Sequence, residues 1–409
     1  MASETTGGEM HRLYVIHHGL ENRRSHFYGE GLGWVAACRE RGVDLSLYVH
    51  RTATPSIAEQ LHAHASFRHR AGTASIARLM GGTSGDHAII VNWFAEDCTS
   101  LEAEGIGRDD IVVVTFASEI EVMGAALWFE RVPAERRPRL VFIFHREPCL
   151  HLSMQEDRAG VNADFSDFMA AIARLKSTLP PERMSLLATT PHLAALLRSV
   201  AQHPCAEAPH PSFYLSEDVL AKETEPQVHV RVPGQLRLEK GSAILAEVLL
   251  RFAEARPGKP LSVQANDQAD ASEMALQLKA CKSPFSVYYG QLSHAQYQRR
   301  VVASDIVLLP YDWRRYPLRA SGVFSEAVGF GIPTVVPDRT WMADNLRAGL
   351  GAGTIFEEQS ADAILKALLA ASDDHAALRK RARGAMQKWR RMHSIAALLE
   401  TVLRIGGSN

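Results

Sequence analysis

Two segments in the second half of the chain combine glycine with basic residues in a pattern that suits the binding of an anion. The first is Pro233–Gly241 (PGQLRLEKG), between an expected strand and a helix expected to begin near Ser242. Gly234 allows a tight turn, while Arg237 and Lys240 bring positive charge to the start of that helix. A forked guanidinium and a point-charge ammonium together suit a diphosphate. A solvated β-α turn with two exposed bases is the alternative reading.

The second segment follows the short apolar run Ile306–Leu309, an expected strand that ends at Pro310. A polar loop rich in arginine then leads to Ser321 and Gly322, where a helix is expected to begin. Such a helix start offers unpaired backbone N–H groups and the positive end of the helix dipole, which favour a phosphate. An ordinary α/β crossover with a solvated basic loop fits the same residues. Both segments follow strands, and ligands of parallel sheets gather at the carboxyl ends of the strands.

Strands and helices are expected to alternate along the whole chain, and the strands read as continuous apolar runs. Strands are expected at 13–16, 45–49, 88–91, 111–115, 140–144, 185–188, 229–232, 261–263, 285–289 and 306–309, and a basic helix over 56–80. Continuous apolar strands separated by helices predict parallel sheets covered on both faces. The expected fold class is α/β, with two Rossmann-like, doubly wound domains.

The length of 409 residues exceeds what one hydrophobic core usually serves. From about 202 to 227 the periodicity is lost and prolines accumulate, which predicts a linker. We expect a first domain over 1–205, a linker over 206–227, a second domain over 228–385 and a final segment over 386–409.

The composition of the chain gives no support for several classes of binding site. Lys and Arg number 45 against 46 Asp and Glu, so the whole chain offers no argument for nucleic-acid binding. The five cysteines are scattered, which fits a reducing cytosol better than disulfides or a zinc site. His17, His18 and His26 have no recognisable metal-ligand spacing, so no metal is expected.

A cytoplasmic protein is expected. Contact of its basic segments with a membrane surface remains an alternative, and no oligomeric state is indicated.

The two segments resemble a known family when they are taken together. PGQLRLEKG followed by SDIVLLPY and RASGVFSEAVGFGIPTVVP looks like the donor-binding domain of GT-B fold glycosyltransferases, in particular the retaining nucleotide-sugar enzymes with an E-x7-E element. The resemblance covers roughly 228–344. It implies a metal-independent enzyme without a cofactor that moves a hexose-type sugar from a nucleotide-diphosphate sugar to a glycan, a lipid or a small molecule. It also implies that the final helix returns to the first domain.

The resemblance assigns roles to several residues. Arg237 and Lys240 would contact the donor diphosphate, Ser321 and Gly322 would present backbone N–H groups, and Glu326 would accept from the ribose hydroxyls. For Glu326 the alternative is a helix-face carboxylate that the helix dipole favours. Other donor contacts are implied for Gly234, Gly290, Leu292, Arg319 and Val323.

Two residues of the first half join this expected site through the resemblance. His145, at the end of an expected strand, would face the donor sugar and is grouped with Arg237 and Lys240 as catalytic. Its alternative is a strand-end histidine bonded to a loop carbonyl. Gly19 matches the first-loop glycine near the diphosphate.

The chain departs from the family pattern at two positions. Leu318 stands where the first glutamate of E-x7-E is expected, and Gln235 stands where an arginine is common. Arg319–Ala327 nevertheless resembles an Arg-x-x-Ser-Gly-Val-Phe-x-Glu-Ala pattern found in part of the family, which favours a variant donor pocket.

Two other classes of protein remain as alternatives. One is a catalytically inert GT-B module that binds a nucleotide sugar or glycan, which Leu318 supports. The other is a nucleotide-sugar isomerase, which would need acid–base carboxylates facing the donor. A redox dinucleotide enzyme is disfavoured because no Gly-x-Gly-x-x-Gly follows the first strand.

Overall fold

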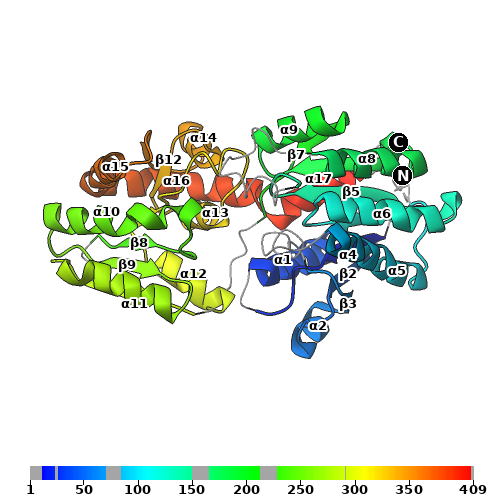
Figure 1. Cartoon of the computed structure of the whole chain (residues 1–409), viewed down its shortest axis with the longest axis horizontal. Helices are drawn as coiled ribbons and strands as arrows, with labels where there is room; N and C mark the ends of the chain where they lie inside the picture. The colour runs from blue at the N-terminus through cyan, green and yellow to red at the C-terminus, as the bar shows by residue number, and fades with distance from the viewer. Residues whose placement is uncertain are drawn as a thin grey trace, which may run out of the picture. The chain divides into compact units, whose positions relative to one another are not determined.

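The computed structural model describes residues 12–23, 26–70, 84–149, 165–211, 228–290 and 292–406. The chain divides into two compact units, Met1–Pro209 with Ile395–Asn409, and His210–Ser394. Figure 1 shows that each unit consists of a sheet with helices packed around it. Among the residues described, no helix combines the length and apolar character needed to cross a bilayer.

The first unit contains a parallel sheet of seven strands in the order β3-β2-β1-β4-β5-β6-β7. Strand order reverses between β1 and β4, which makes the carboxyl ends of these neighbours the place where ligands of such a sheet gather. The strands are β1 (Leu13–His17), β2 (Leu45–His50), β3 (Ala63–Phe67), β4 (Ile111–Val114), β5 (Arg139–Phe144), β6 (Met184–Ala188) and β7 (Cys205–Glu207).

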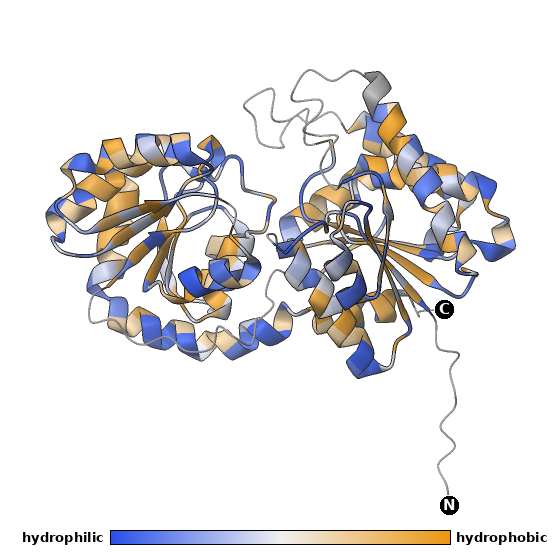
Figure 2. Ribbon diagram, turned by 90° about the horizontal axis from the view of Figure 1, so that it is seen from below, coloured by the Kyte–Doolittle hydropathy of each residue, from blue (hydrophilic) through white to orange (hydrophobic). Residues whose placement is uncertain are grey.

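Helices cover this sheet because each places an apolar stripe against the strands. They are α1 (His26–Arg41), α2 (Pro55–Leu61), α4 (Ser84–Asp97), α5 (Thr99–Ala103), α6 (Glu119–Arg131), α8 (Ser166–Thr178), α9 (Pro191–Ala201) and α17 (Ile395–Gly406), with short 3₁₀ turns at Ala134–Arg136 and Pro181–Arg183. The last helix, α17, joins a core with Trp34 of α1 and the centre of the sheet. Figure 2 shows the apolar strands enclosed by helices that are polar outside.

Two sequence-based expectations in the first unit are wrong. The run 88–91 is part of the helix α4 rather than a strand, because Ile90, Val91 and Phe94 are buried at helical spacing while Ile89 and Trp93 are exposed. The helix expected over 56–80 ends at Leu61, since His62 adopts a left-handed conformation with φ of 48°, and β3 follows. Residues 71–80 of that expected helix lie outside the described ranges.

The second unit contains a parallel sheet of six strands in the order β10-β9-β8-β11-β12-β13. Here the order reverses between β8 and β11, the two strands that the basic glycine segments follow. The strands are β8 (Val230–Val232), β9 (Leu261–Gln264), β10 (Phe285–Tyr288), β11 (Ile306–Leu308), β12 (Thr334–Pro337) and β13 (Gly353–Phe356). The expected α/β fold class with doubly wound parallel sheets is confirmed.

The helices of the second unit enclose two apolar clusters, one on each face of its sheet. These helices are α10 (Ser242–Ala255), α11 (Gln268–Gln277), α12 (His294–Val302), α13 (Gly322–Gly329), α14 (Trp341–Arg347), α15 (Ala361–Asp373) and α16 (His375–Met392), with 3₁₀ turns at Leu238–Lys240 (η4) and Leu278–Ala280 (η5). The basic helix α16 is anchored by Trp389, whose indole N–H donates to the Ser325 carbonyl of α13 at 3.0 Å. The chain passes to the first unit between Ser394 and Ile395.

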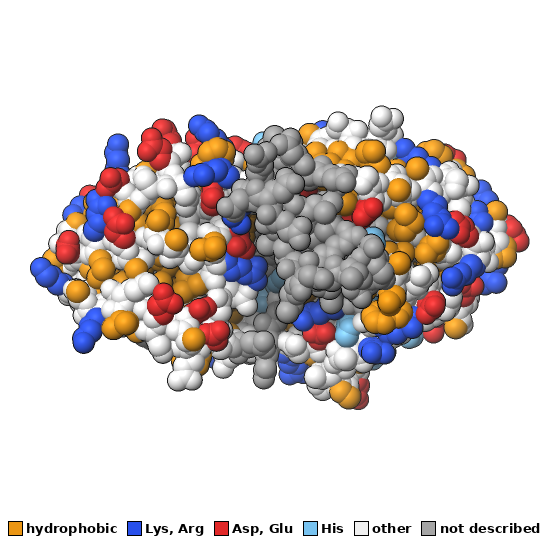
Figure 3. Space-filling view, viewed as in Figure 1, with side chains coloured by type: hydrophobic (Ala, Val, Ile, Leu, Met, Phe, Trp, Pro, Cys, Tyr) orange, Lys and Arg blue, Asp and Glu red, His pale blue; other side chains and the backbone are white. Residues whose placement is uncertain are grey.

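Charges of both signs are interspersed on the surface of each unit on the face drawn in Figure 3. This distribution agrees with the nearly equal numbers of acidic and basic residues in the sequence.

Candidate active site

The turn after β8 brings three of the predicted residues together. Gly234 has a φ of +92°, which strongly favours glycine, and its backbone N–H donates to the Gln264 side chain at 3.0 Å. A methyl group on Gly234 would lie 3.4 Å from Nζ of Lys240 and 3.5 Å from Cγ2 of Val323. The turn therefore places the Lys240 ammonium and the start of α13 around one small space.

Lys240 ends the 3₁₀ turn η4, and its ammonium lies 5.4 Å from the centroid of the Tyr311 ring. Burial lowers the pKa of Lys240, because the surrounding protein solvates the ammonium less well than water does. A partly buried cation of this kind gains more from an anionic ligand than an exposed one does. Gly241 follows with a φ of +78° and is the N-cap residue of α10.

Arg237 lies on the same turn and is about half exposed. Its guanidinium bonds the Gln235 side chain and lies 3.6 Å from the Glu239 carboxylate. These are surface contacts, which contribute little to stability and leave the side chain free to exchange partners.

The helix α13 begins in the way that an anion site requires. Ser321 is its N-cap, and the Ser321 hydroxyl accepts from the Phe324 N–H at 3.2 Å. The amides of Gly322 and Val323, at the first two helical positions, therefore have no acceptor within the helix. Tyr311, which follows β11, also hydrogen-bonds the Ser321 side chain, and burial raises the pKa of this tyrosine to about 12. Tyr311 was not predicted, although its place directly after a strand-ending proline is a usable signal.

Glu326 lies on α13 and is only 4% exposed. Burial raises the pKa of Glu326 to about 8, so the protonated form prevails at neutral pH. The Tyr297 hydroxyl of α12 donates to this carboxyl group, which opposes the shift only in part. A ribose hydroxyl at Glu326 would have to share the carboxyl with Tyr297, a partner that local sequence did not indicate.

The remaining predicted donor contacts are distributed around the same unit. Gly290 follows β10 with a φ of +90° and has open space beside it, and Leu292 precedes α12. The Arg319 guanidinium lies 5.7 Å from the centroid of the Tyr316 ring. Arg300 of α12, which sequence reasoning missed, lies 3.7 Å over the ring of Tyr288 at the end of β10.

Gly19 and His145 belong to the first unit, where an aromatic cluster connects them. A methyl group on Gly19 would lie 2.8 Å from the Phe27 ring, Phe27 packs edge-on against Phe116 at 4.7 Å, and Phe116 stacks on His145 at 4.3 Å. His145 Nε2 is 2.9 Å from the carbonyl oxygen of Thr115. Burial lowers the pKa of His145 to about 3, so the imidazole is neutral and donates this hydrogen bond.

The three histidines considered as metal ligands do not converge. His17 and His26 both approach Glu30, with Nε2 to carboxylate distances of 3.6 and 3.8 Å. His18 instead lies 3.1 Å from the carboxylate of Glu121. Burial lowers the pKa of His17 to about 3, so this imidazole is neutral at neutral pH, and burial raises the pKa of Glu30 well above its usual range.

No protein-family model matches the chain, and no curated protein matches it in sequence. Solved structures match it over nearly its whole length. WaaG, a glycosyltransferase involved in lipopolysaccharide biosynthesis, matches with a TM-score of 0.64 at 14% identity over 97% of this chain and 100% of its own. The catalytic domain of starch synthase IV from Arabidopsis thaliana, bound to ADP and acarbose, has a TM-score of 0.61 at 11% identity over 98% and 100%. Anabaena Alr3699/HepE with UDP has a TM-score of 0.58 at 14% identity over 98% and 100%. The resemblance drawn from the two motifs is confirmed at the level of the fold: this chain has the GT-B fold of these glycosyltransferases.

Proposed function

We propose that the chain is a retaining glycosyltransferase that moves a sugar from a nucleotide-diphosphate sugar to an acceptor. The observation that carries the proposal is the convergence of Gly234, Lys240 and Val323 where strand order reverses between β8 and β11. A ligand held there would meet a glycine turn without a side chain, a partly buried ammonium and the amides of a helix start that have no acceptor within the helix. The neighbours crystallised with UDP, UDP-glucose and ADP support a nucleotide sugar as the donor.

The diphosphate would be neutralised without a metal at this position. Lys240 would supply a point charge, Arg237 would supply a forked contact after exchanging its surface partners, and the amides of Gly322 and Val323 would complete the set. Lys240 and the two amides are in place before the reaction, so they would stabilise the charge that accumulates on the leaving diphosphate as the glycosidic bond breaks. Arg319 lies on the same loop and would contact the donor as well.

The nucleoside would lie between α13 and the turn after β10. Glu326 would bind the ribose with Tyr297 as a shared partner, and the open turn at Gly290 with Leu292 would contact the base. The roles that the family resemblance implies for Gly19 at the diphosphate and for His145 at the sugar stay predictions. A neutral His145, whose Nε2–H donates to the Thr115 carbonyl, would not act as a cation.

The test uses Lys240→Ala and Arg237→Ala with Lys279→Ala, an exposed lysine on η5, as the matched control. Binding of UDP and ADP is measured by calorimetry, and release of nucleoside diphosphate is measured over a panel of nucleotide sugars. We expect kcat/KM to fall by about 10- to 100-fold in the two site variants, equivalent to ~1.4–3 kcal/mol, and to be unchanged in the control. Equal kcat/KM in all three variants would remove the diphosphate assignment.

A catalytically inert module that binds nucleotide sugars is the second candidate, because Leu318 occupies the position of an expected carboxylate. The same calorimetry separates the two functions. Binding that Lys240→Ala weakens, without sugar release or transfer by the unaltered protein over the donor panel, would favour the inert module. Retention of anomeric configuration is then tested by analysing the anomer of the first transferred product.

A further inference from the structure

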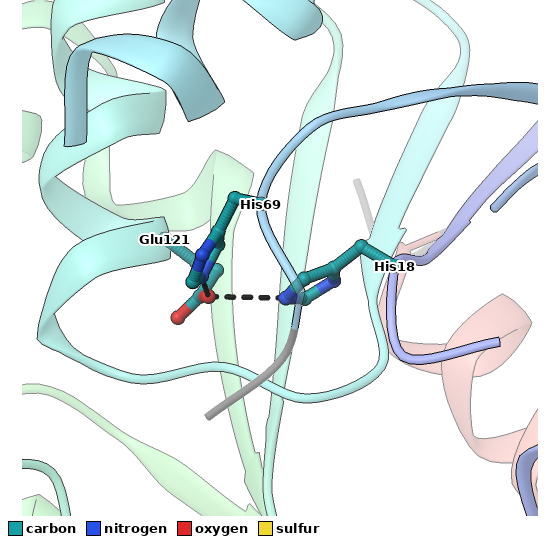
Figure 4. Close-up of side chains that lie close together, drawn as sticks. All are labelled: His18, His69 and Glu121. Atoms are coloured by element: carbon teal, nitrogen blue, oxygen red, sulfur yellow. Dashed lines mark hydrogen bonds and ion pairs between the residues drawn. The ribbon is translucent and has the colours of Figure 1, made fainter. Parts of the chain in front are cut away.

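A second cluster of polar side chains lies in the first unit, apart from the residues assigned to the donor. His18, His69 and Glu121 are all buried, with exposures of 0, 3 and 1%. The Nε2 atoms of the two histidines lie 3.1 and 2.8 Å from the same carboxylate oxygen, Oε1 of Glu121. Figure 4 shows both imidazoles pointing at this oxygen from different loops.

Three separate crossovers supply these residues. His18 follows β1, His69 follows β3, and Glu121 lies in the first turn of α6, which follows β4. All three strands are parallel, so their carboxyl ends lie on one edge of the sheet. The cluster includes the point where strand order reverses between β1 and β4, which is where such sheets bind their ligands.

The carboxylate of Glu121 is held in a fixed orientation. Its other oxygen, Oε2, accepts from the Ser118 N–H at 2.8 Å and from the Ser118 hydroxyl at 2.5 Å as part of the capping box of α6. These bonds fully occupy Oε2 and direct Oε1 toward the imidazoles. Hydrogen bonds to the far side of a ligating carboxylate are the usual way in which metal sites orient their ligands.

The three ligand atoms lie close enough together for a small divalent ion to bind between them. One ligand atom from each residue lies within 4.8 Å of the other two. Ligands at about 2.0–2.1 Å from a tetrahedral ion are about 3.3 Å apart. Oε1 lies 3.1 and 2.8 Å from the two Nε2 atoms, so these two pairs need to widen by only a few tenths of an ångström. Each imidazole would move its proton from Nε2 to Nδ1, and in His18 the Nδ1 atom has no hydrogen-bond partner among the described residues, so no bond is lost there.

We propose that His18 Nε2, His69 Nε2 and Glu121 Oε1 form a buried binding site for a divalent transition metal of the Zn²⁺ class. Two imidazoles with one carboxylate are ligands that Zn²⁺ accepts, and three protein ligands leave one position for water or another oxygen group. The ion would cross-link the loops after β1 and β3 to the start of α6. It would also neutralise a carboxylate that is otherwise buried against two imidazoles. This site is independent of the metal-free diphosphate contacts proposed for the second unit.

The test is a metal titration of the full chain after treatment with a chelator. Co²⁺ serves as the spectroscopic probe, because a tetrahedral site with nitrogen and oxygen ligands gives intense visible d–d bands. Zn²⁺ is then used to displace it, and Mg²⁺, which prefers octahedral oxygen ligands, is the negative control. We expect one Co²⁺ per chain, displaced by Zn²⁺ and unaffected by Mg²⁺, together with a higher Tm in the metal-bound protein.

Substitution of each proposed ligand tests which side chains bind the metal. His69→Gln and His18→Gln are expected to weaken Co²⁺ binding at least tenfold. His64→Gln, an exposed histidine on β3, is the matched control and should bind as the unaltered protein does. Glu121→Gln tests the carboxylate ligand. Circular dichroism checks that this variant retains its helical content. If the content falls, the two histidine variants decide whether the metal binds at this cluster. Lys240→Ala should retain the metal, which separates this result from the test of the donor site.

Two results would overturn the proposal. One is the absence of stoichiometric Co²⁺ and Zn²⁺ binding, which would leave the cluster as a set of buried hydrogen bonds. The other is binding that persists unchanged in both His18→Gln and His69→Gln, which would place the metal elsewhere.

Discussion

A methyl group added to Gly241 would lie 2.1 Å from the carbonyl oxygen of Pro310. The two loops of the proposed donor site, one after β8 and one after β11, therefore meet backbone to backbone at this glycine. No side chain fits at residue 241 unless one of the loops moves. The spacing of Lys240 from Tyr311 and α13 depends on that contact.

Gly241→Ala is expected to destabilise the protein by about 3 kcal/mol, because it adds a steric clash to the strain of a positive φ. Gly258→Ala is the matched control, since Gly258 has a φ of +82° and nothing within 4 Å of an added methyl. The control should lose only about 1 kcal/mol. Urea unfolding measures both. Equal losses of unfolding free energy would show that the loop carrying Pro310 moves to accommodate the methyl group without a further loss of stability.

Ser321→Ala is expected to remove the N-cap of α13 and to cost about 1 kcal/mol of unfolding free energy. It should also weaken UDP and ADP binding, because the amides of Gly322 and Val323 lose their fixed orientation. Ser360→Ala removes an equivalent cap, since the Ser360 hydroxyl accepts from Ala363 N–H of α15 at the same 3.2 Å. This control should lose stability alone. A similar loss of nucleotide affinity in both variants would contradict a phosphate contact at α13.

Glu326 should make the stability of the protein decrease as pH rises. Its folded pKa of about 8 lies above the usual carboxyl value of 4.5, so its stabilising effect is complete below about pH 4.5 and is lost as pH rises toward 8. Glu326→Gln removes this titration, and Glu254→Gln, at an exposed position on α10, leaves it in place. Unfolding free energies measured from pH 5 to 8 should fall less steeply in Glu326→Gln than in the other two proteins. Parallel slopes in all three would mean that Glu326 is not the group responsible.

His145 should make the stability of the protein decrease as pH falls below about 6.5. Its folded pKa of about 3 lies below the usual histidine value of 6.5, so its contribution is complete above about pH 6.5 and is lost as pH falls toward 3. Between pH 7 and pH 5 this group should account for about 2 kcal/mol of lost stability. His145→Gln should lose correspondingly less over that interval, whereas the exposed His64→Gln should behave as the unaltered protein. An identical acid loss in His145→Gln would show that the buried imidazole is not a source of acid sensitivity.

The local features of the donor site were predictable from the sequence. Glycine at 234, a capping serine at 321 and a proline after β11 act through their own backbone preferences, which neighbours along the chain suffice to reveal. The alternation of apolar strands and helices was equally local, and it predicted both parallel sheets. The helix expected over 56–80 was one exception, and the run 88–91 was the other. Its β-branched residues favour a strand, but the segment forms the helix α4 because a helix buries one of its faces.

The sequence by itself predicted most of the elements and the two turns proposed to bind an anion, because glycine, proline and capping residues act over a few residues. Only the tertiary structure decided which of these residues meet. Gly241 touches Pro310, Glu326 accepts a hydrogen bond from Tyr297, and Glu121 contacts two histidines, one of them 103 residues away along the chain. Desolvation and proximity set the pKa and the ligand geometry of each group, and both depend on segments that come together only when the sheets are complete.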